Sequence, residues 1–183
     1  AVQKAFWVGL HVMPWRDPEI LSGTGALNDL PKHLYSKNLK KALIVTDSFL
    51  SKTDHFCRMT QNMEKAGFSY TIYNKTVPNP TIQNIEEATS MFFKEKCDSI
   101  VAFGGGSSID CAKGALLRIA RPKYPLNKSH LLVKIKKNVP YLVAIPTTSG
   151  TGSEATLATV ITDPQSEAKY AQSAMALIPK LAV

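Results

Sequence analysis

The 183-residue sequence lacks the features that mark several large classes of protein. No apolar run approaches the roughly 20 residues that a membrane-spanning helix needs, and no N-terminal signal pattern stands out. There are only three cysteines, Cys57, Cys97 and Cys111, and no C-x-x-C pair, which argues against a zinc site or a disulfide framework. We therefore expect reduced thiols, a cytoplasmic protein and no membrane partner.

Acidic residues are missing from one long stretch, residues 118–137, which supplies much of the net charge of +8. We interpret this stretch as a solvated loop, because it contains one aromatic residue, Tyr124, and no recognised nucleic-acid-binding motif. We therefore predict no nucleic-acid partner, and an anionic cofactor or partner nearby is the remaining alternative. The basic residues of the stretch are Arg118, Arg121, Lys123, Lys128, Lys134, Lys136 and Lys137.

The length and the 44% share of hydrophobic residues suit one well-buried α/β domain over residues 1–183. Short apolar runs predict strands at residues 41–46, 68–73, 99–103 and 141–145. Helical spacing of apolar residues predicts helices at residues 50–66, 82–96 and 108–120, the second capped by Thr81. This alternation predicts a Rossmann-like parallel sheet with helices on both faces.

Both ends of the chain depart from this alternation. Residues 5–12 read as a strand that could pair across a homodimer, and Leu27, Leu30 and Leu34 form a helical stripe. After Pro146 the chain is rich in β-branched residues, so we predict an appended β-hairpin. Its strands are expected at residues 156–162 and 167–173, joined by a turn at residues 163–166.

Three glycines follow the third core strand, in the segment GGGSSID at residues 104–110. Their spacing fits neither the dinucleotide pattern G-x-G-x-x-G nor the phosphate loop G-x-x-x-x-G-K-[ST]. A main chain without Cβ atoms still lets a phosphate approach closely, and the next helix points its amides at the turn. We expect Ser107 to cap that helix, with Asp110 as its capping-box partner. The segment predicts an anion site, although a ligand-free turn would use similar residues.

Hydroxyl side chains crowd the loop after the fourth strand, PTTSGTGSE at residues 146–154. Its two glycines can fold these hydroxyls around a diphosphate or a ribose, and a flexible surface loop is the alternative. G-x-S-x-G cannot be aligned on Ser149 or Ser153, which excludes a nucleophile elbow. Asp47 ends the first core strand, where an acid can accept hydrogen bonds from a ribose diol or cap a helix.

Taken in order, these segments resemble the motifs of the iron-containing, or group III, alcohol dehydrogenases. The matching segments are Asp47 after the first core strand, PNP at residues 78–80, GGGSSID at residues 104–110 and PTTSGTGSE at residues 146–154. The resemblance covers nearly the whole chain, and the combination is specific although no single motif is. It implies the N-terminal domain of a dehydroquinate-synthase-like fold, in which the glycines hold the pyrophosphate of NAD.

The resemblance also implies cofactor contacts position by position. Asp47 would bind the adenosine ribose and favour NAD over NADP, and Asn79 would lie beside the adenosine half. Gly105, Gly106 and Ser107 would take the diphosphate.

Further contacts are implied toward the nicotinamide side and from the second loop and the hairpin. Asp110 would anchor the glycine turn near the nicotinamide. The other implied contacts are Thr147, Thr148, the weaker candidate Ser153, the hairpin lysine Lys169 and, at the border of the cleft, Leu177.

The family holds a divalent metal, usually iron, with one Asp and three His from a following helical domain. We expect that domain to be absent from this chain, so no metal ligand and no catalytic residue is predicted within residues 1–183. This chain alone is expected to be inactive, with iron bound only in the full-length protein. The four histidines lie upstream of the ligand positions and form no i, i+4 pair on a predicted helix: His11, His33, His55 and His130.

The resemblance implies that the full-length protein is an NAD-dependent, iron-dependent alcohol dehydrogenase. It would interconvert small alcohols and aldehydes or ketones by hydride transfer. A non-catalytic nucleotide-binding module is one alternative. A relative of the glycerol or sugar-phosphate dehydrogenases is another, but the complete PTTSGTGSE segment favours the alcohol branch.

Overall fold

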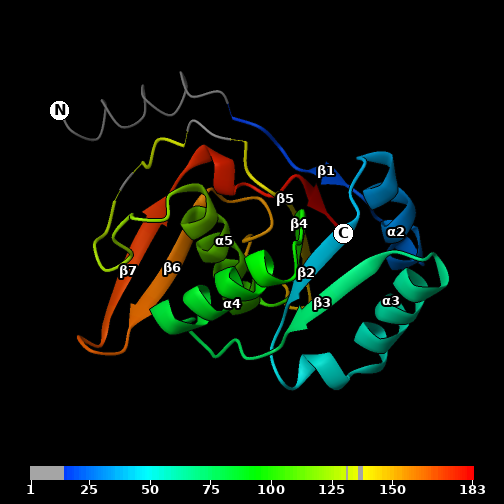
Figure 1. The fold of residues 1–183 in the computed structure, drawn as a ribbon, viewed down its shortest axis with the longest axis horizontal. Helices are drawn as coiled ribbons and strands as arrows, with labels where there is room; N and C mark the ends of the chain where they lie inside the picture. The colour runs from blue at the N-terminus through cyan, green and yellow to red at the C-terminus, as the bar shows by residue number, and fades with distance from the viewer. Residues whose placement is uncertain (1–14, 131, 136–137) are drawn as a thin grey trace.

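Short apolar strands form the centre of the fold, in a computed structural model that describes residues 15–130, 132–135 and 138–183. Six parallel strands make one sheet in the order β1-β8-β5-β4-β2-β3 (Figure 1). They are β1 (Glu19–Ile20), β2 (Lys41–Val45), β3 (Ser69–Tyr73), β4 (Ser99–Gly104), β5 (Tyr141–Pro146) and β8 (Leu181–Ala182). The four predicted core strands are confirmed. Strands β1 and β8 were not predicted, because two residues carry no periodic pattern.

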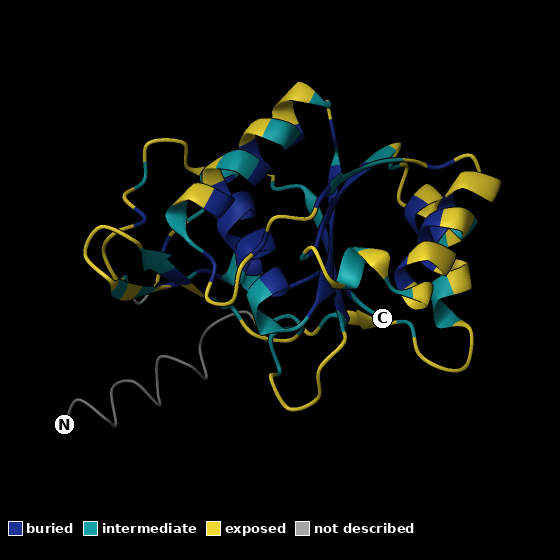
Figure 2. Cartoon of the chain, turned by 90° about the horizontal axis from the view of Figure 1, so that it is seen from below, coloured by how far each residue is buried: buried dark blue, intermediate teal, exposed yellow. Residues whose placement is uncertain are grey.

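Helices cover both faces of the sheet, as predicted for a Rossmann-like domain. They are α2 (Ala26–Ser36), α3 (Asp54–Lys65), α4 (Ile82–Lys94) and α5 (Gly106–Ala120). Figure 1 shows α2 and α3 on one side of the sheet and α4 and α5 on the other. Figure 2 shows that each helix turns its buried side toward the sheet. None of the helices in the described residues combines the length and apolar character needed to cross a bilayer.

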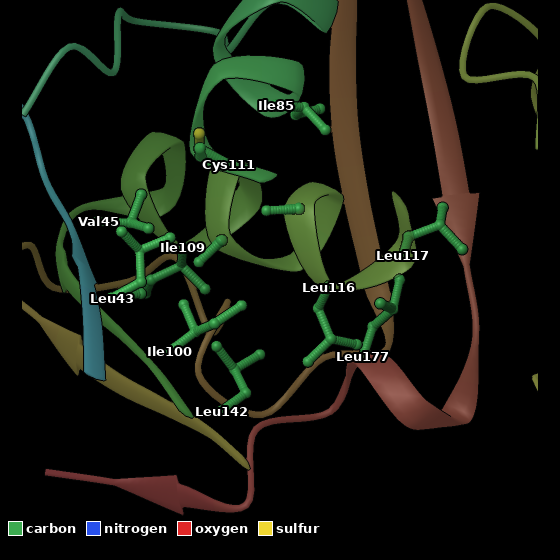
Figure 3. Close-up of a cluster of buried hydrophobic side chains, with 14 of the residues drawn as sticks. Leu43, Val45, Ile85, Ile100, Ile109, Cys111, Leu116, Leu117, Leu142 and Leu177 are labelled. Atoms are coloured by element: carbon green, nitrogen blue, oxygen red, sulfur yellow. The ribbon is translucent and has the colours of Figure 1, made fainter. Parts of the chain in front are cut away.

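The buried strands alternate their side chains between two core layers, because successive residues point to opposite faces. Leu43, Ile100 and Leu142 pack under α4 and α5, in the cluster drawn in Figure 3. Ile44 and Val101 pack against α2 and α3 on the other face. Both faces are therefore apolar, which is why these strands read as continuous apolar runs in the sequence.

The predicted helix over residues 50–66 is divided in the structure. A 3₁₀ turn, η1 (Leu50–Lys52), comes first, and Thr53 is extended before α3 begins at Asp54. The carboxylate of Asp47 accepts hydrogen bonds from the amides of Phe49 and Leu50, which folds this first turn separately. Helix α3 then ends as predicted before Gly67, whose φ of 73° favours glycine.

Helix α4 begins with the predicted Thr81 cap. The Thr81 hydroxyl accepts from the amide of Asn84 at 3.2 Å, and the Asn84 side chain accepts from the amide of Thr81 at 3.1 Å. This reciprocal pair satisfies two amides that a helix start would otherwise leave unpaired. It fixes the direction in which the chain leaves residues 78–80, the loop that joins the candidate site below.

The predicted hairpin is confirmed, with β6 (Ala158–Asp163) antiparallel to β7 (Ala168–Ser173). The side chain of Asp163 closes the turn by accepting from the amide of Gln165 and the hydroxyl of Ser166. A short 3₁₀ turn, η2 (Met175–Leu177), then leads the chain back to β8. The strand expected at residues 5–12, and the homodimer contact suggested for it, lie outside the described residues.

Part of the basic stretch at residues 118–137 packs on this hairpin. The amide of His130 donates to the carbonyl of Ala171, and the amide of Val133 donates to the carbonyl of Ser173. The guanidinium of Arg118 pairs with Glu86 at 2.5 Å. The stretch is therefore held by backbone bonds and at least one ion pair in its described part, and is less free than the solvated loop that the composition predicted.

The contact between α4 and α5 predicts a cost for any side chain at Gly114. A Cβ there would lie 2.5 Å from Cδ1 and 2.7 Å from Cγ1 of Ile85. We expect Gly114→Ala to destabilise the protein by about 1–3 kcal/mol, because overpacking outweighs the gain in helix propensity. Urea unfolding of a double-mutant cycle with Ile85→Ala measures this. A cost unchanged when both the Cδ1 and Cγ1 atoms of Ile85 are removed would contradict the steric explanation.

Candidate functional site

The loops after β4 and β5 start at the same level of the sheet. Gly104 pairs with Pro146, and the amide of Thr147 donates to the carbonyl of Gly104 at 3.1 Å. Gly104 has a φ of 149°, and a Cβ on it would overlap the hydroxyl of Ser108, so only glycine fits this position. The two predicted loops therefore meet at the carboxyl ends of the strands, where open α/β sheets bind ligands.

The next two glycines lie against the second loop. A Cβ on Gly105 would lie 2.9 Å from the hydroxyl oxygen of Thr148, and one on Gly106 would lie 3.4 Å from that of Ser153. Thr147 and Thr148 are exposed to solvent. The structure thus brings Gly105, Gly106, Thr148 and Ser153 together, and the missing Cβ atoms leave the backbone of α5 accessible beside the hydroxyls.

Helix α5 begins two residues earlier than predicted, which corrects the roles expected for Ser107 and Asp110. Gly105 is the N-cap residue, and no side chain caps it. Ser107 and Asp110 lie inside the helix and form no capping box. The first-turn amides of α5 therefore carry the positive end of the helix dipole without a side-chain cap, which favours an anion there.

The PNP loop and the hairpin join the same edge through Asn79. Asn79 has a φ of 56°, its amide donates to the Ser107 hydroxyl at 3.2 Å, and its side-chain oxygen accepts from the Lys169 ammonium at 2.9 Å. The amide of Thr162 also donates to the carbonyl of Pro80. Three predicted site residues from three separate segments are thus in direct contact.

Asp47 stands at the end of β2, the neighbour of β4 in the sheet. One carboxylate oxygen, Oδ1, accepts from the amides of Phe49 at 2.9 Å and Leu50 at 2.8 Å. The sequence left a ribose contact and a helix-capping role open for this residue. In the structure Asp47 closes the turn that leads into η1, although the N-cap residue of η1 is Phe49. A ribose contact can use the other oxygen, Oδ2, so the two roles are compatible.

Asp110 lies one turn into α5, beneath the glycine turn. Its Oδ2 accepts from the amide of Val160 at 3.2 Å, and its carbonyl accepts from the Thr159 hydroxyl at 2.8 Å. Burial raises the pKa of the Asp110 carboxyl to about 6, while the Val160 amide and the charge of Lys113 lower it. Asp110 therefore anchors β6 to α5. Its implied role of anchoring the glycine turn near the nicotinamide stays a prediction.

Lys113, which was not predicted from the sequence, is fully buried one turn after Asp110. Burial lowers the pKa of its ammonium to about 8, and the charges of Asp110 and Glu154 oppose this shift. A lysine is almost never fully buried unless it is paired. Its place in the otherwise apolar helical segment CAKGALL was the signal that could have identified it.

Leu177 is the one predicted contact that the structure does not bring to the surface. It is fully buried in η2 and belongs to the apolar cluster that also holds Leu116 and Leu117 of α5 (Figure 3). Its position at the border of a cofactor cleft stays a prediction.

Two grooves lie at opposite edges of the sheet. One of about 950 Å³ opens on the α2–α3 side beside Leu50, Phe103, Ile145 and Thr147, at the carboxyl ends of the strands. The other, of about 660 Å³, is lined by residues at the amino ends of the strands and contains no predicted site residue. The first groove is thus continuous with the candidate site, and its floor is largely apolar.

Metal-ligating side chains do not gather in the described part of the chain: no group of three or more His, Cys, Asp or Glu could hold an ion there. The histidines that can be placed lie on different segments. The ring of His33 bonds the Tyr141 hydroxyl, His55 lies on α3, and His130 lies beside β7, while His11 is outside the described residues.

Comparisons with known proteins agree on one group. The family model for "iron-containing alcohol dehydrogenase" matches residues 17–183. The chain is 36% identical over 166 residues to the NAD-dependent methanol dehydrogenase of Bacillus methanolicus, covering 91% of this chain and 43% of that protein. It is 37% identical over 150 residues to the lactaldehyde reductase of Escherichia coli K12, covering 81% of this chain and 39% of that protein.

A solved structure shares the fold. The alcohol dehydrogenase from Oenococcus oeni superposes with a TM-score of 0.84 at 31% identity, over 92% of this chain and 45% of that one. The chain therefore spans less than half the length of each of these relatives.

The buried carboxyl of Asp110 predicts a pH dependence of stability. Because its pKa is raised in the folded protein, its protonated form stabilises the fold below about pH 4, and this contribution is lost as the pH rises through about 6. Asp110→Asn keeps an oxygen for the Val160 amide but does not titrate. Between pH 4 and 7 the wild type should lose on the order of 1–3 kcal/mol relative to the variant. Urea unfolding at several pH values measures the difference, and parallel curves would contradict it.

Proposed function

The chain belongs to the iron-containing alcohol dehydrogenase family, and we propose that it is the NAD-binding part of a metal-dependent alcohol dehydrogenase. The names of its relatives, an NAD-dependent methanol dehydrogenase and a lactaldehyde reductase among them, support small alcohols and aldehydes as substrates. Because the chain spans less than half of those proteins, the activity is proposed for the whole protein.

The assignment of NAD as the cofactor rests on the surroundings of the first turn of α5. The first turn of α5 has no side-chain cap, and the glycines before and within it face the hydroxyls of the second loop. Amides, hydroxyls and the positive end of a helix dipole together suit a diphosphate. The exposed ammonium of Lys169, held by Asn79, adds a positive charge at the same edge.

The adenosine half of NAD fits the side of the site where Asp47 stands. Its free carboxylate oxygen can accept from a ribose hydroxyl, while the first oxygen holds the turn at Phe49 and Leu50. Leu50 also lines the groove of about 950 Å³, whose apolar floor suits a planar base. We place the adenosine toward this groove and the nicotinamide toward Asp110.

The residues of this chain bind and orient the cofactor in the proposed reaction. Bound NAD would accept the hydride that an alcohol carbon loses when the alcohol is oxidised to the aldehyde. The first turn of α5 holds the diphosphate. Asp110 fixes the position of that turn relative to β6, because its carboxylate accepts a hydrogen bond from the Val160 amide. The described residues offer no fitting metal site, so no step through iron is assigned to them.

The location, oligomeric state and metal of the whole protein are also part of the proposal. A cytoplasmic location and a homodimer remain predictions from the sequence. Iron, or another divalent metal, is proposed for the whole protein as the family description indicates.

Calorimetric titration with NADH tests the proposal at Gly105. Gly105→Val should weaken NADH binding about tenfold or more, about 1.4 kcal/mol or above, because the side chain occupies the space of the diphosphate. Its Cβ would also press on Thr148, so the double variant Gly105→Val with Thr148→Ala is needed. If the new valine side chain fills the space of the diphosphate, the double variant should still bind NADH weakly.

Ala155→Val, an exposed change at the end of the same loop, is the matched control and should bind normally. Recovery of affinity in the double variant would show that only the position of Thr148 mattered. Unchanged binding by a folded Gly105→Val protein would remove this turn from the cofactor site.

Asp47 predicts the choice between the two nicotinamide cofactors. Asp47→Gly should improve NADP use relative to NAD by about tenfold, because a carboxylate repels an added 2′-phosphate. Asp47→Asn keeps the acceptor for the Phe49 and Leu50 amides and removes only the charge, so it separates charge from turn structure. Activity ratios with the two cofactors measure both. A wild type that prefers NADP, with neither variant changing the ratio, would show the assignment to be wrong.

A further inference from the structure

Lys113 places a fully satisfied ammonium group inside the fold. Its Nζ donates to the carbonyl of Thr156 at 2.6 Å, the hydroxyl of Thr156 at 2.9 Å and the carbonyl of Ala158 at 3.0 Å. An ammonium has three donors, so each one is used. All three acceptors lie just beyond the 147–154 loop, at Thr156 and at Ala158, the first residue of β6.

The loop is consequently attached at both ends to the same strand–helix unit. At its start, the amide of Thr147 donates to the carbonyl of Gly104 at the end of β4. At its end, Lys113 of α5 holds Thr156 and Ala158. Between these attachments, Thr148, Thr151 and Ser153 lie beside Gly105 and Gly106. Residues 147–151 of the loop are exposed.

The charges around Lys113 explain how a lysine can be buried here. The titratable groups that face it are Asp110, on its own helix, and Glu154, in the loop. Within the described residues, Oε2 of Glu154 is buried and has no hydrogen-bond partner. Removing the charge of Lys113, Asp110 or Glu154 would leave a buried charge without compensation, which strongly destabilises the folded structure around it.

We propose that Lys113 is a positioning residue of the dinucleotide site, whose ammonium group holds the 147–154 loop at the spacing from residues 104–107 that a diphosphate requires. This proposal rests on the proposed function. Lys113 does not touch the cofactor; it acts through the backbone of Thr156 and Ala158. The spacing it fixes is narrow, since a Cβ on Gly105 would lie only 2.9 Å from the hydroxyl oxygen of Thr148.

The proposal predicts a loss of affinity that is specific for the diphosphate. In the complete protein, Lys113→Met should weaken NADH and ADP binding at pH 7 at least about tenfold, and adenosine binding by less than about twofold. Lys94→Met, on the exposed face of α4, is the matched control and should bind like the wild type. Calorimetry measures all three ligands.

The pH profile separates positioning from a purely structural effect. Wild-type NADH affinity should fall as the pH rises through about 8, where Lys113 loses its proton and with it a donor. Lys113→Arg stays charged, so its affinity should remain within a few-fold of the wild type and lack this fall. Equal pH profiles for the folded Lys113→Arg protein and the wild type would overturn the proposal.

Thr156→Val provides a test in a side chain that is exposed, in case Lys113→Met does not fold. It removes one acceptor of the ammonium, so affinity should fall a few-fold and the decline with pH should begin at a lower pH. If both measurements match the wild type, the proposal is wrong even though the wild type binds NADH. If the wild type itself binds no NADH, the proposed function fails and this proposal with it.

Discussion

The in-register pairing of β4 with β5 is the constraint on which the site depends. It places Gly104 beside Pro146, so that the glycine turn and the hydroxyl loop begin at one level of one sheet edge. Both strands are buried on both faces, by α2 and α3 on one side and α4 and α5 on the other. A shift of register by one residue would turn the apolar side chains to the wrong layer, so packing fixes the register and the register fixes the site.

The hairpin extends this edge with polar contacts. Asp110 and Lys113 of α5 hold the start of β6, and Asn79 connects Ser107 to Lys169 of β7. Burying an acid and a lysine side by side costs solvation that their mutual attraction only partly returns. Such a pair contributes little to overall stability, and its effect is to hold loops in fixed relative positions around the space proposed for the diphosphate.

The sequence predicted the core strands, the hairpin and the meeting of the two loops that form the candidate site, because apolar runs and glycine spacing are local signals. It placed the start of α5 two residues too late, since Ser107 looked like a cap while Gly105 takes that position. It missed β1 and β8, which are two residues long and form only through pairing with distant segments. Lys113 was missed because its acceptors lie more than forty positions away in the chain, as the hydrogen bonds to Thr156 and Ala158 show.

In the proposed complex, NAD binds with its diphosphate on the first turn of α5. Amide chemical shifts of ¹⁵N-labelled protein, followed during titration with NAD and separately with adenosine, test it most directly. We expect NAD to shift the amides of residues 105–108 and 147–153 most strongly, and adenosine to leave those of residues 105–108 nearly unchanged. Shifts concentrated around the groove at the opposite edge, beside Asp98, Tyr141 and Lys180, would contradict it.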